Sequence, residues 1–492
     1  MLTNIYLENF KAFHKLDDLK IKPLTVLCGV NSGGKSSILK SLLLLKQSYE
    51  NSSATNEATL NGVYTVNGLM KDILYNGNGE AFSIRNRFHV KYTGNKFVKN
   101  SKQDISTAKE LGKITRLNDQ VSSFDIDVTC SINKKEVAKM WDTNYIKYYL
   151  VIVTPQLKGK QKSKSLSFKI ELKYRPGKKG KYDVILENLP TISGDRISYT
   201  MQNCTCYFSG MKLTNLYYES SEVEGRKIEL SDFLTNIYSV FRIVAEQYSG
   251  IKYLGPLREN PKRQYSISND YYSADCKGAD APFMLAKNQS KKVIPELYPP
   301  KEEDDFSYKM ELANGHLLEL VNCWMRYFDL GDLSVEKLHE ILEVDVKERN
   351  IADVGFGISQ TLPIIVQGLS MDFEQTLLLE QPEIHLHPRM QMRMADFLLT
   401  LSQTNHGIIV ETHSDHIINR LVRRALEDKS GNLLKAIGIY FVENSDEGSR
   451  VQEITIDQVC GISEPPKEFF SQFASETSYI IQAGLKNMKG RI

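Results

Sequence analysis

One stretch of eight residues, Gly29 to Ser36, constrains the fold of this chain more than any other feature. It reads Gly-Val-Asn-Ser-Gly-Gly-Lys-Ser and matches the phosphate-binding pattern G-x-x-x-x-G-K-[ST] at every fixed position. The apolar run 24–28 predicts a buried strand before this stretch, and the apolar run 37–45 predicts a buried helix after it. A strand, a glycine-rich turn and a helix in this order are typical of an α/β protein with a phosphate loop.

The chemistry of this loop predicts a site for a nucleoside triphosphate. Glycines allow backbone N–H groups to turn inward around a polyphosphate, and the start of the helix adds a positive dipole. We expect Lys35 to neutralise the outer phosphates and Ser36 to ligate Mg²⁺. The residues expected to contact the nucleotide are Gly29, Asn31, Ser32, Gly33, Gly34, Lys35, Ser36 and Ser37.

Two apolar runs in the last third of the chain end in residues that suit this site. The run 376–379 predicts a strand that ends at Glu380, and in a parallel sheet this carboxylate would lie beside the phosphate loop. We therefore expect Glu380 to hold Mg²⁺ directly or through water. The stretch 407–414 predicts a further short apolar strand that ends in a histidine, which places His413 at the carboxyl edge of the sheet, where ligands bind.

A second glycine-rich turn, with the sequence Val-Gly-Phe-Gly-Ile-Ser-Gln, lies at 354–360. It precedes a predicted helix over 361–366, whose first turn tolerates Pro363. A glycine-rich turn with a hydroxyl at a helix start is again typical of an anion site, here with Gly357 and Ser359. One triphosphate needs only one of the two turns.

The composition indicates a soluble globular protein. With 492 residues, 41% of them hydrophobic, the chain is long enough for roughly three domains and a large core. No run approaches the roughly 18 apolar residues of a membrane span, and the first residues predict a strand rather than a secretory leader. The seven cysteines are odd in number and scattered, which favours reduced thiols. We expect a cytoplasmic protein without a membrane contact.

The residue pattern divides the chain into three parts. Residues 1–95 carry the phosphate loop after a predicted hairpin that turns at 17–18, and residues 96–229 predict a β-rich insertion. Residues 230–492 return to alternating helices and strands, apart from an expected long surface loop at 255–300. We expect an α/β fold with a mixed central sheet. The sequence holds no internal repeat and no long coiled coil.

Charge is unevenly distributed along the chain. The formal net charge is only +2, but the segment Lys158 to Lys181 holds ten basic residues and one acidic residue. Such a segment predicts salt-dependent contact with an acidic partner, either nucleic acid or protein. An equally good interpretation is a solvated flank of a β-hairpin.

Four motifs in a fixed order resemble those of a known family. They are the phosphate loop, Gly-Phe-Gly-Ile-Ser-Gln at 355–360, Glu-Gln-Pro-Glu-Ile-His-Leu-His-Pro at 380–388 and Glu-Thr-His-Ser-Asp at 411–415. Together they resemble the ABC-type ATPase heads of the RecF, SMC and OLD kind, which are P-loop NTPases. The resemblance implies ATP and Mg²⁺ as ligands.

Within that group, the chain is similar to the stand-alone bacterial ATPases that include the PtuA ATPase of Septu anti-phage defence. The stretches Tyr253–Glu259 and Pro465–Phe473 also resemble this subgroup. The resemblance covers about residues 1–95 and 230–492 and leaves the insertion out.

The resemblance implies a role for each matching residue. The phosphate loop would hold ATP and Mg²⁺, with Glu380 as the strand-end acid and His413 as the switch histidine. Gly357 and Ser359 would be the signature that contacts the nucleotide of the opposite protomer. A homodimer around nucleotide, or a higher homo-oligomer, is therefore implied, and the second anion site agrees with it.

Three functions are compatible with these motifs. The first is an ATP-hydrolysing, switchable dimer that regulates or drives a separate effector, such as a nuclease in bacterial anti-phage defence. OLD nucleases carry a metal-dependent domain after the ATPase, whereas the residues after His413 hold no cluster of Asp and Glu, so the effector would be another protein. The second is a RecF-like clamp in DNA maintenance. The third is a scaffold that binds ATP and hydrolyses it slowly.

The residue that activates water departs from the ABC pattern. In most such heads a glutamate follows the strand-end acid and acts as general base, but this chain has Gln381 there. A glutamine orients water through its amide and cannot accept a proton at neutral pH. We expect Glu383 to contribute as the base of a slow hydrolysis. The alternative is that Gln381 and His413 only position the water.

Overall fold

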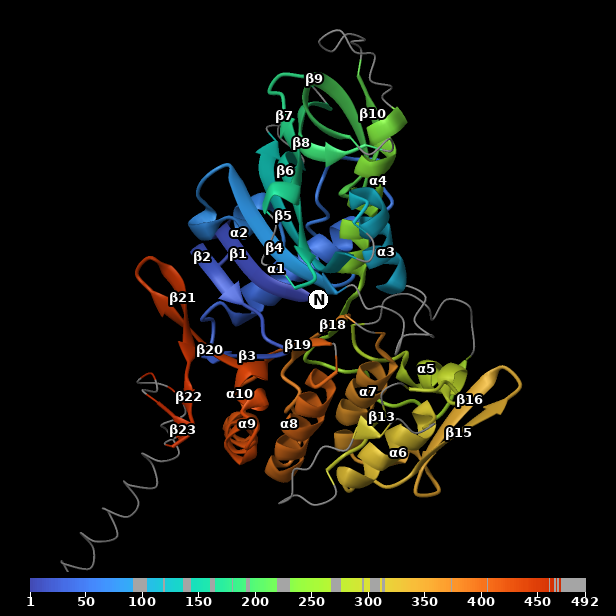
Figure 1. Ribbon diagram of the computed structural model, residues 1–492. Coiled ribbons are helices and arrows are strands. Elements are labelled where there is room, and N and C mark those ends of the chain that lie inside the picture. The colour runs from blue at the N-terminus through green and yellow to red at the C-terminus, as the bar shows by residue number, and fades with distance from the viewer. Residues whose placement is uncertain are drawn as a thin grey trace, which may run out of the picture.

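A six-stranded sheet that carries the phosphate loop lies at the centre of the computed structural model (Figure 1). Strand β21 is antiparallel to its neighbour, and the other strands are parallel. The α/β fold with a mixed central sheet is thereby confirmed. The order of strands across the sheet is β11 (Ile251–Leu254), β18 (Thr376–Glu380), β19 (Gly407–Glu411), β3 (Leu24–Gly29), β20 (Ile437–Ser445) and β21 (Gly448–Ile454).

The structure describes most of the chain. Its described residues are 1–91, 104–117, 120–135, 143–159, 164–178, 180–191, 195–218, 231–266, 276–293, 296–300, 310–311, 315–372, 374–404, 406–459, 461–463, 466 and 469.

The central sheet separates two hydrophobic cores. On β3, Leu27 packs into one core, while its neighbours Val26 and Cys28 pack into the other. Successive side chains of a strand point to opposite faces, so a strand buried on both faces needs an almost continuous apolar run. The same holds for β18 and β19, whose apolar residues are all buried.

A nine-stranded antiparallel sheet covers one side of the central sheet (Figure 1). The strands of the predicted insertion continue the sheet that the N-terminal hairpin begins, and the division of the chain into 1–95, 96–229 and 230–492 stays a prediction. The order is β10 (Lys212–Tyr217), β9 (Arg196–Ser209), β8 (Lys181–Pro190), β7 (Phe168–Tyr174), β6 (Thr143–Leu157), β5 (Val121–Lys135), β4 (Ala81–Lys91), β1 (Leu2–Phe10) and β2 (Phe13–Lys20).

The N-terminal hairpin turns at Lys11 and Ala12 instead of at 17–18. Asp17 and Asp18 are exposed residues within β2, whose buried positions recur every third residue because the register with β1 shifts. This irregular spacing hides the second strand from a period-two search.

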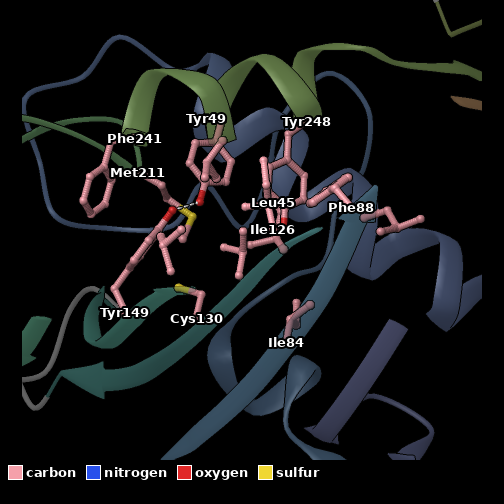
Figure 2. Close-up of a cluster of buried hydrophobic side chains, with 14 of the residues drawn as sticks. Leu45, Tyr49, Ile84, Phe88, Ile126, Cys130, Tyr149, Met211, Phe241 and Tyr248 are labelled. Atoms are coloured by element: carbon pink, nitrogen blue, oxygen red, sulfur yellow. Dashed lines mark hydrogen bonds between the residues drawn. The ribbon is translucent and has the colours of Figure 1, made fainter. Parts of the chain in front are cut away.

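Two helices pack against both sheets, α1 (Lys35–Glu50) and α4 (Ser231–Ser249), and α3 (Asp104–Thr115) packs against α4 and the nine-stranded sheet. Figure 2 shows buried aromatic rings where α1, α4 and β6 meet. The ring of Tyr49 stacks on that of Tyr248 with centroids 4.7 Å apart, and the hydroxyl groups of Tyr49 and Tyr149 are hydrogen-bonded. The helix that begins at the phosphate loop is therefore packed directly against the insertion.

Helices cover the other face of the central sheet: α6 (Leu317–Tyr327), α7 (Phe356–Ser370), α8 (Pro388–Ser402), α9 (Asp415–Glu427) and α10 (Asn432–Ala436). Helix α7 begins five residues before the predicted 361, so Pro363 lies in its interior and not in its first turn. The expected loop at 255–300 contains helix α5 (Ala281–Asn288), whose Ala281 and Leu285 are buried. Polar neighbours on both sides of this short apolar segment led to the wrong prediction.

The remaining described elements are short or peripheral. None of the helices in the described part of the chain is long and apolar enough to cross a membrane. The short or peripheral elements are α2 (Met70–Ile73), β12 (Tyr265–Ser266), β13 (Glu296–Leu297), β14 (Met310–Glu311), β15 (Leu333–Leu338), β16 (Ile341–Val346), β17 (Arg349–Asn350), β22 (Ile456–Asp457) and β23 (Gly461–Ile462).

Candidate functional site

The carboxyl ends of β3, β19 and β18 meet at one edge of the parallel sheet. Strand β19 lies between the other two, with Glu411 in register with Glu380 on one side and with Leu27 on the other. In-register side chains of neighbouring parallel strands point to the same face, so the two carboxylates lie side by side. The sequence predicts that Glu380 lies beside the phosphate loop, but β19 separates its strand, β18, from β3.

The phosphate loop joins β3 to α1 through backbone conformations that suit glycine. Gly29 and Gly34 have φ angles of 130° and 105°, and a Cβ at Gly29 would lie 2.1 Å from the carbonyl oxygen of Val442. Lys35 donates hydrogen bonds from Nζ to the carbonyl oxygens of Gly29 (3.0 Å) and Val30 (2.7 Å), and burial lowers its pKa. The other predicted contacts lie along the same turn and the start of α1: Asn31, Ser32, Gly33, Ser36 and Ser37.

The hydroxyl of Ser36 donates a hydrogen bond to Oε1 of Glu411 at 3.0 Å. Glu411 is 5% exposed, and its Oε2 is buried with no hydrogen-bond partner in the described part of the chain. Burial, reinforced by the negative charge of Glu380, raises the pKa of Glu411 to about 7. A buried polar atom without a partner costs about 1–3 kcal/mol, so this oxygen is expensive to keep unless a ligand uses it.

The residues at this edge fit Mg²⁺, which the family resemblance implies. Mg²⁺ prefers oxygen ligands and takes one or two carboxylates together with substrate phosphates and water. The hydroxyl of Ser36, the carboxylate of Glu380 and the unpartnered oxygen of Glu411 supply such ligands. In the described chain, no group of three or more His, Cys, Asp and Glu side chains is arranged as a metal site of protein ligands alone.

Tyr253 of β11 and Arg258, which follows this strand, fix the end of β18. The hydroxyl of Tyr253 donates a hydrogen bond to Oε1 of Glu380 at 2.9 Å. The guanidinium of Arg258 donates to the carbonyl oxygens of Glu380 (3.0 Å) and Gln381 (3.2 Å), and to Oε1 of Gln360 on α7 (3.4 Å). Burial lowers the pKa of Arg258 to about 10. The strand-end acid and helix α7 are thus held by one buried cation.

Both oxygens of Glu383 are used by the turn that carries the histidine. Oε1 accepts the backbone N–H of His413 at 2.7 Å, and Oε2 accepts the hydroxyl of Thr412 at 2.9 Å. Burial raises the pKa of Glu383, while burial and the charge of Lys35 lower the pKa of His413. Gln381 has a positive φ of 45°, and its N–H donates to the carbonyl oxygen of Glu411 at 2.7 Å. The three predicted catalytic residues therefore lie in two turns, after β18 and after β19, that hydrogen bonds join to each other.

The predicted signature lies at the start of α7, which packs against α5, α6 and α8. Gly355, the N-cap, is exposed, Gly357 is half-buried and Ser359 is 4% exposed. A Cβ at Gly355 would meet nothing within 4 Å. The exposed part of the signature is therefore the turn at Gly355 and not the hydroxyl of Ser359.

Several cations of the basic segment are paired with carboxylates of the antiparallel sheet. Glu171 contacts Lys169 at 3.0 Å and Lys173 at 2.9 Å, and Asp183 contacts Arg175 at 2.6 Å. Lys160, Lys162 and Lys179 lie outside the described residues, and so does the side chain of Lys164. The described part of the segment is thus less cationic than its composition predicts.

Three residues of the site are absent from the sequence-based candidates: Glu411, Tyr253 and Arg258. Tyr253 and Arg258 lie in the stretch Tyr253–Glu259, and Glu411 lies in the motif 411–415, within the strand predicted to end at His413. The signal that could have identified Glu411 is its position, since a carboxylate that ends a buried parallel strand faces the ligand edge.

Comparisons with known proteins were made with the sequence and with the structure. A family model described as AAA ATPase domain matches residues 1–418, which confirms the expected ATPase head. A comparison with curated proteins gave no match.

Solved SMC head domains resemble the structure over most of its length. The SMC head domain from Thermotoga maritima has a TM-score of 0.35 and 10% identity, and the similarity covers 92% of this chain and 99% of that chain. An SMC head bound to the C-winged helix domain of ScpA has a TM-score of 0.36 and 11% identity, with 93% and 98% covered. At these values, nothing about activity or partners follows from the similarity.

Proposed function

The chain belongs to the AAA ATPase domain family, and from that premise we propose that it binds ATP with Mg²⁺ and hydrolyses the ATP at the carboxyl edge of its parallel sheet. One observation carries the proposal: the phosphate-loop hydroxyl of Ser36 is hydrogen-bonded to a strand-end carboxylate, with a second carboxylate in register beside it. Phosphate loop and strand-end acids together are the parts that phosphoryl transfer needs.

Each residue of the site has its own role in binding or hydrolysing ATP. The N–H groups of the loop and Lys35 bind the phosphates. Ser36 and Glu380 would hold Mg²⁺, which neutralises phosphate charge when bound. Glu383 fixes the turn of His413, and its raised pKa suits a group that accepts a proton near neutral pH. Gln381 orients the attacking water through its amide.

The phosphate-loop lysine tests this proposal. Lys35→Ala removes the cation that faces the phosphates, so ATP affinity should fall to the detection limit in isothermal titration calorimetry. Lys71→Ala is the matched control, because Lys71 is exposed on α2, away from the loop. Wild-type ATP affinity in Lys35→Ala would refute the site.

We also propose that two copies close around nucleotide, with the turn at Gly355 and Gly357 of one copy facing the phosphate loop of the other. The exposure of Gly355 supports this arrangement. Because Ser359 is buried, an arginine there would disturb the fold, whereas Gly355→Arg adds its bulk in open space. Gly355→Arg should keep ATP binding and lose ATP-dependent dimerisation in light scattering. A normal dimer would refute the arrangement.

The proposed biological role is regulation of a separate effector, such as a nuclease, in bacterial anti-phage defence. It is supported by the motif resemblance. The RecF-like clamp and the slow ATP-binding scaffold stay as alternatives. Co-purification from the native operon distinguishes these roles: a nuclease that elutes with the protein supports regulation, and binding to DNA alone supports the clamp.

A further inference from the structure

We propose that Glu411, the last residue of β19, is the principal carboxylate of the cation site, ahead of the strand-end acid Glu380. This inference rests on the proposed function, because it assigns the metal partner within the same nucleotide site. Nothing in the motif resemblance gives Glu411 a role.

The first argument is the position of β19. This strand lies directly beside β3, which leads into the phosphate loop, whereas β18 is one strand further away. The carboxylate that reaches the loop is accordingly Glu411, through the 3.0 Å contact with the hydroxyl of Ser36. A hydroxyl that donates its proton to a carboxylate keeps its lone pairs for a cation, so Glu411 also orients Ser36.

The second argument compares how the two carboxylates are used. Oε1 of Glu380 already accepts the hydroxyl of Tyr253 at 2.9 Å, and Arg258 is anchored on the backbone at the same strand end. Oε2 of Glu411 is buried and has no hydrogen-bond partner among the described residues. Glu411 therefore carries a buried carboxylate oxygen that no hydrogen bond from the described residues satisfies, on the side chain that also accepts the hydroxyl of Ser36.

The third argument is the local charge. Glu380 and Glu411 are in register on neighbouring strands, and Glu383 lies close enough for its charge to act on Glu411. Lys35, Lys40 and Arg258 are the cations whose charges act on these carboxylates, and Lys35 and Arg258 are also hydrogen-bonded to backbone carbonyl oxygens. A divalent cation held by Ser36 and Glu411 would offset the repulsion between these carboxylates.

The experiment measures Mn²⁺ affinity by electron paramagnetic resonance, with a non-hydrolysable ATP analogue bound. Glu411→Gln keeps the size of the side chain and an acceptor for Ser36 but removes the charge. Its Mn²⁺ affinity should fall at least about tenfold, the low end for loss of a group that ligates or orients a metal ligand. Glu380→Gln, the matched variant on the next strand, should lose less.

The controls separate this inference from the proposed function. Binding of the analogue without metal is measured in wild type and in Glu411→Gln, so that a change in nucleotide affinity is separated from a change in Mn²⁺ affinity, and circular dichroism should show that the variant is folded. If wild type binds neither the analogue nor Mn²⁺, the proposed function fails, and the inference with it. If wild type binds both, and Glu411→Gln binds Mn²⁺ as tightly or loses less affinity than Glu380→Gln, the proposed function stands and the inference is overturned.

Discussion

Asp396 on α8 and Glu411 at the end of β19 are two buried carboxylates on opposite sides of the central sheet. They differ in whether their oxygens accept hydrogen bonds. Asp396 is fully buried and accepts hydrogen bonds from Arg420 (2.8 Å), Arg424 (2.8 Å) and the hydroxyl of Tyr327 (2.7 Å). Glu411 is as deeply placed, but one of its oxygens has no partner in the described structure.

We infer that the fold needs the charge of Asp396, whereas the charge of Glu411 is kept for a ligand. A buried carboxylate is expensive unless its hydrogen bonds are satisfied, and the arginines of α9 satisfy Asp396 within the protein. Glu411 accepts a hydrogen bond from Ser36 and is attracted by the charge of Lys35, but burial and repulsion from Glu380 outweigh both. We infer that the cost is kept because the free oxygen serves the nucleotide site.

The largest predicted effect concerns the satisfied carboxylate. Asp396→Asn removes the charge between two buried arginines and should lower the free energy of unfolding by about 3–5 kcal/mol. Urea denaturation measures this loss in the free energy of unfolding. Asp329→Asn is the control, because Asp329 binds Arg393 at 2.5 Å but its side chain is 64% exposed, so its loss should cost about 0–1 kcal/mol. Equal losses in the two variants would break the comparison.

The next effect is a pH dependence from a third buried group. His406, 6% exposed and next to the start of β19, has its pKa lowered to about 4, chiefly by burial. The unfolded chain therefore binds the proton more readily between pH 6.5 and 4. The contribution of His406 to stability should be fully present above pH 6.5 and fall by up to about 3 kcal/mol as the pH drops to 4. His406→Gln should flatten this part of the curve, and an unchanged slope would contradict it.

A smaller effect, about 1.4 kcal/mol in the activation free energy of ATP hydrolysis, is predicted for Glu383, which binds the turn of His413. Glu383→Gln should reduce steady-state ATP turnover at least about tenfold, because Glu383 loses its proton-accepting charge. Gln381→Glu should leave turnover unchanged or raise it. Full activity in Glu383→Gln would leave Gln381 and His413 as the pair that positions the water.

Much of the fold was predictable because apolar runs and turn residues carry it. The runs 24–28, 376–379 and 407–411 have no polar alternation, so buried parallel strands were the natural prediction. The order of those strands was not predictable in the same way. Periodicity contains no information on which strand lies between two others, and the position of β19 beside β3 is what brings Glu411 and not Glu380 to Ser36.

The same limit applies to burial. Gly357 and Ser359 were predicted in a turn before a helix at 361–366, but α7 begins at Phe356, so both lie in its first turn, with Ser359 buried and Gly355 exposed. Arg258 lies in a quoted motif, yet its contacts with two carbonyl oxygens and Gln360 are tertiary and leave no pattern in the sequence.

The most direct test of the claim that Glu411 is kept for a ligand is urea unfolding of wild type and Glu411→Gln at pH 8, with and without Mg²⁺ and a non-hydrolysable ATP analogue. Without ligand, the variant should be at least as stable as wild type, because a costly buried charge is gone. With ligand at about 100 times its dissociation constant, wild type should gain about 2.7 kcal/mol and the variant clearly less. A variant that is less stable without ligand and gains as much as wild type would show that Glu411 serves the fold.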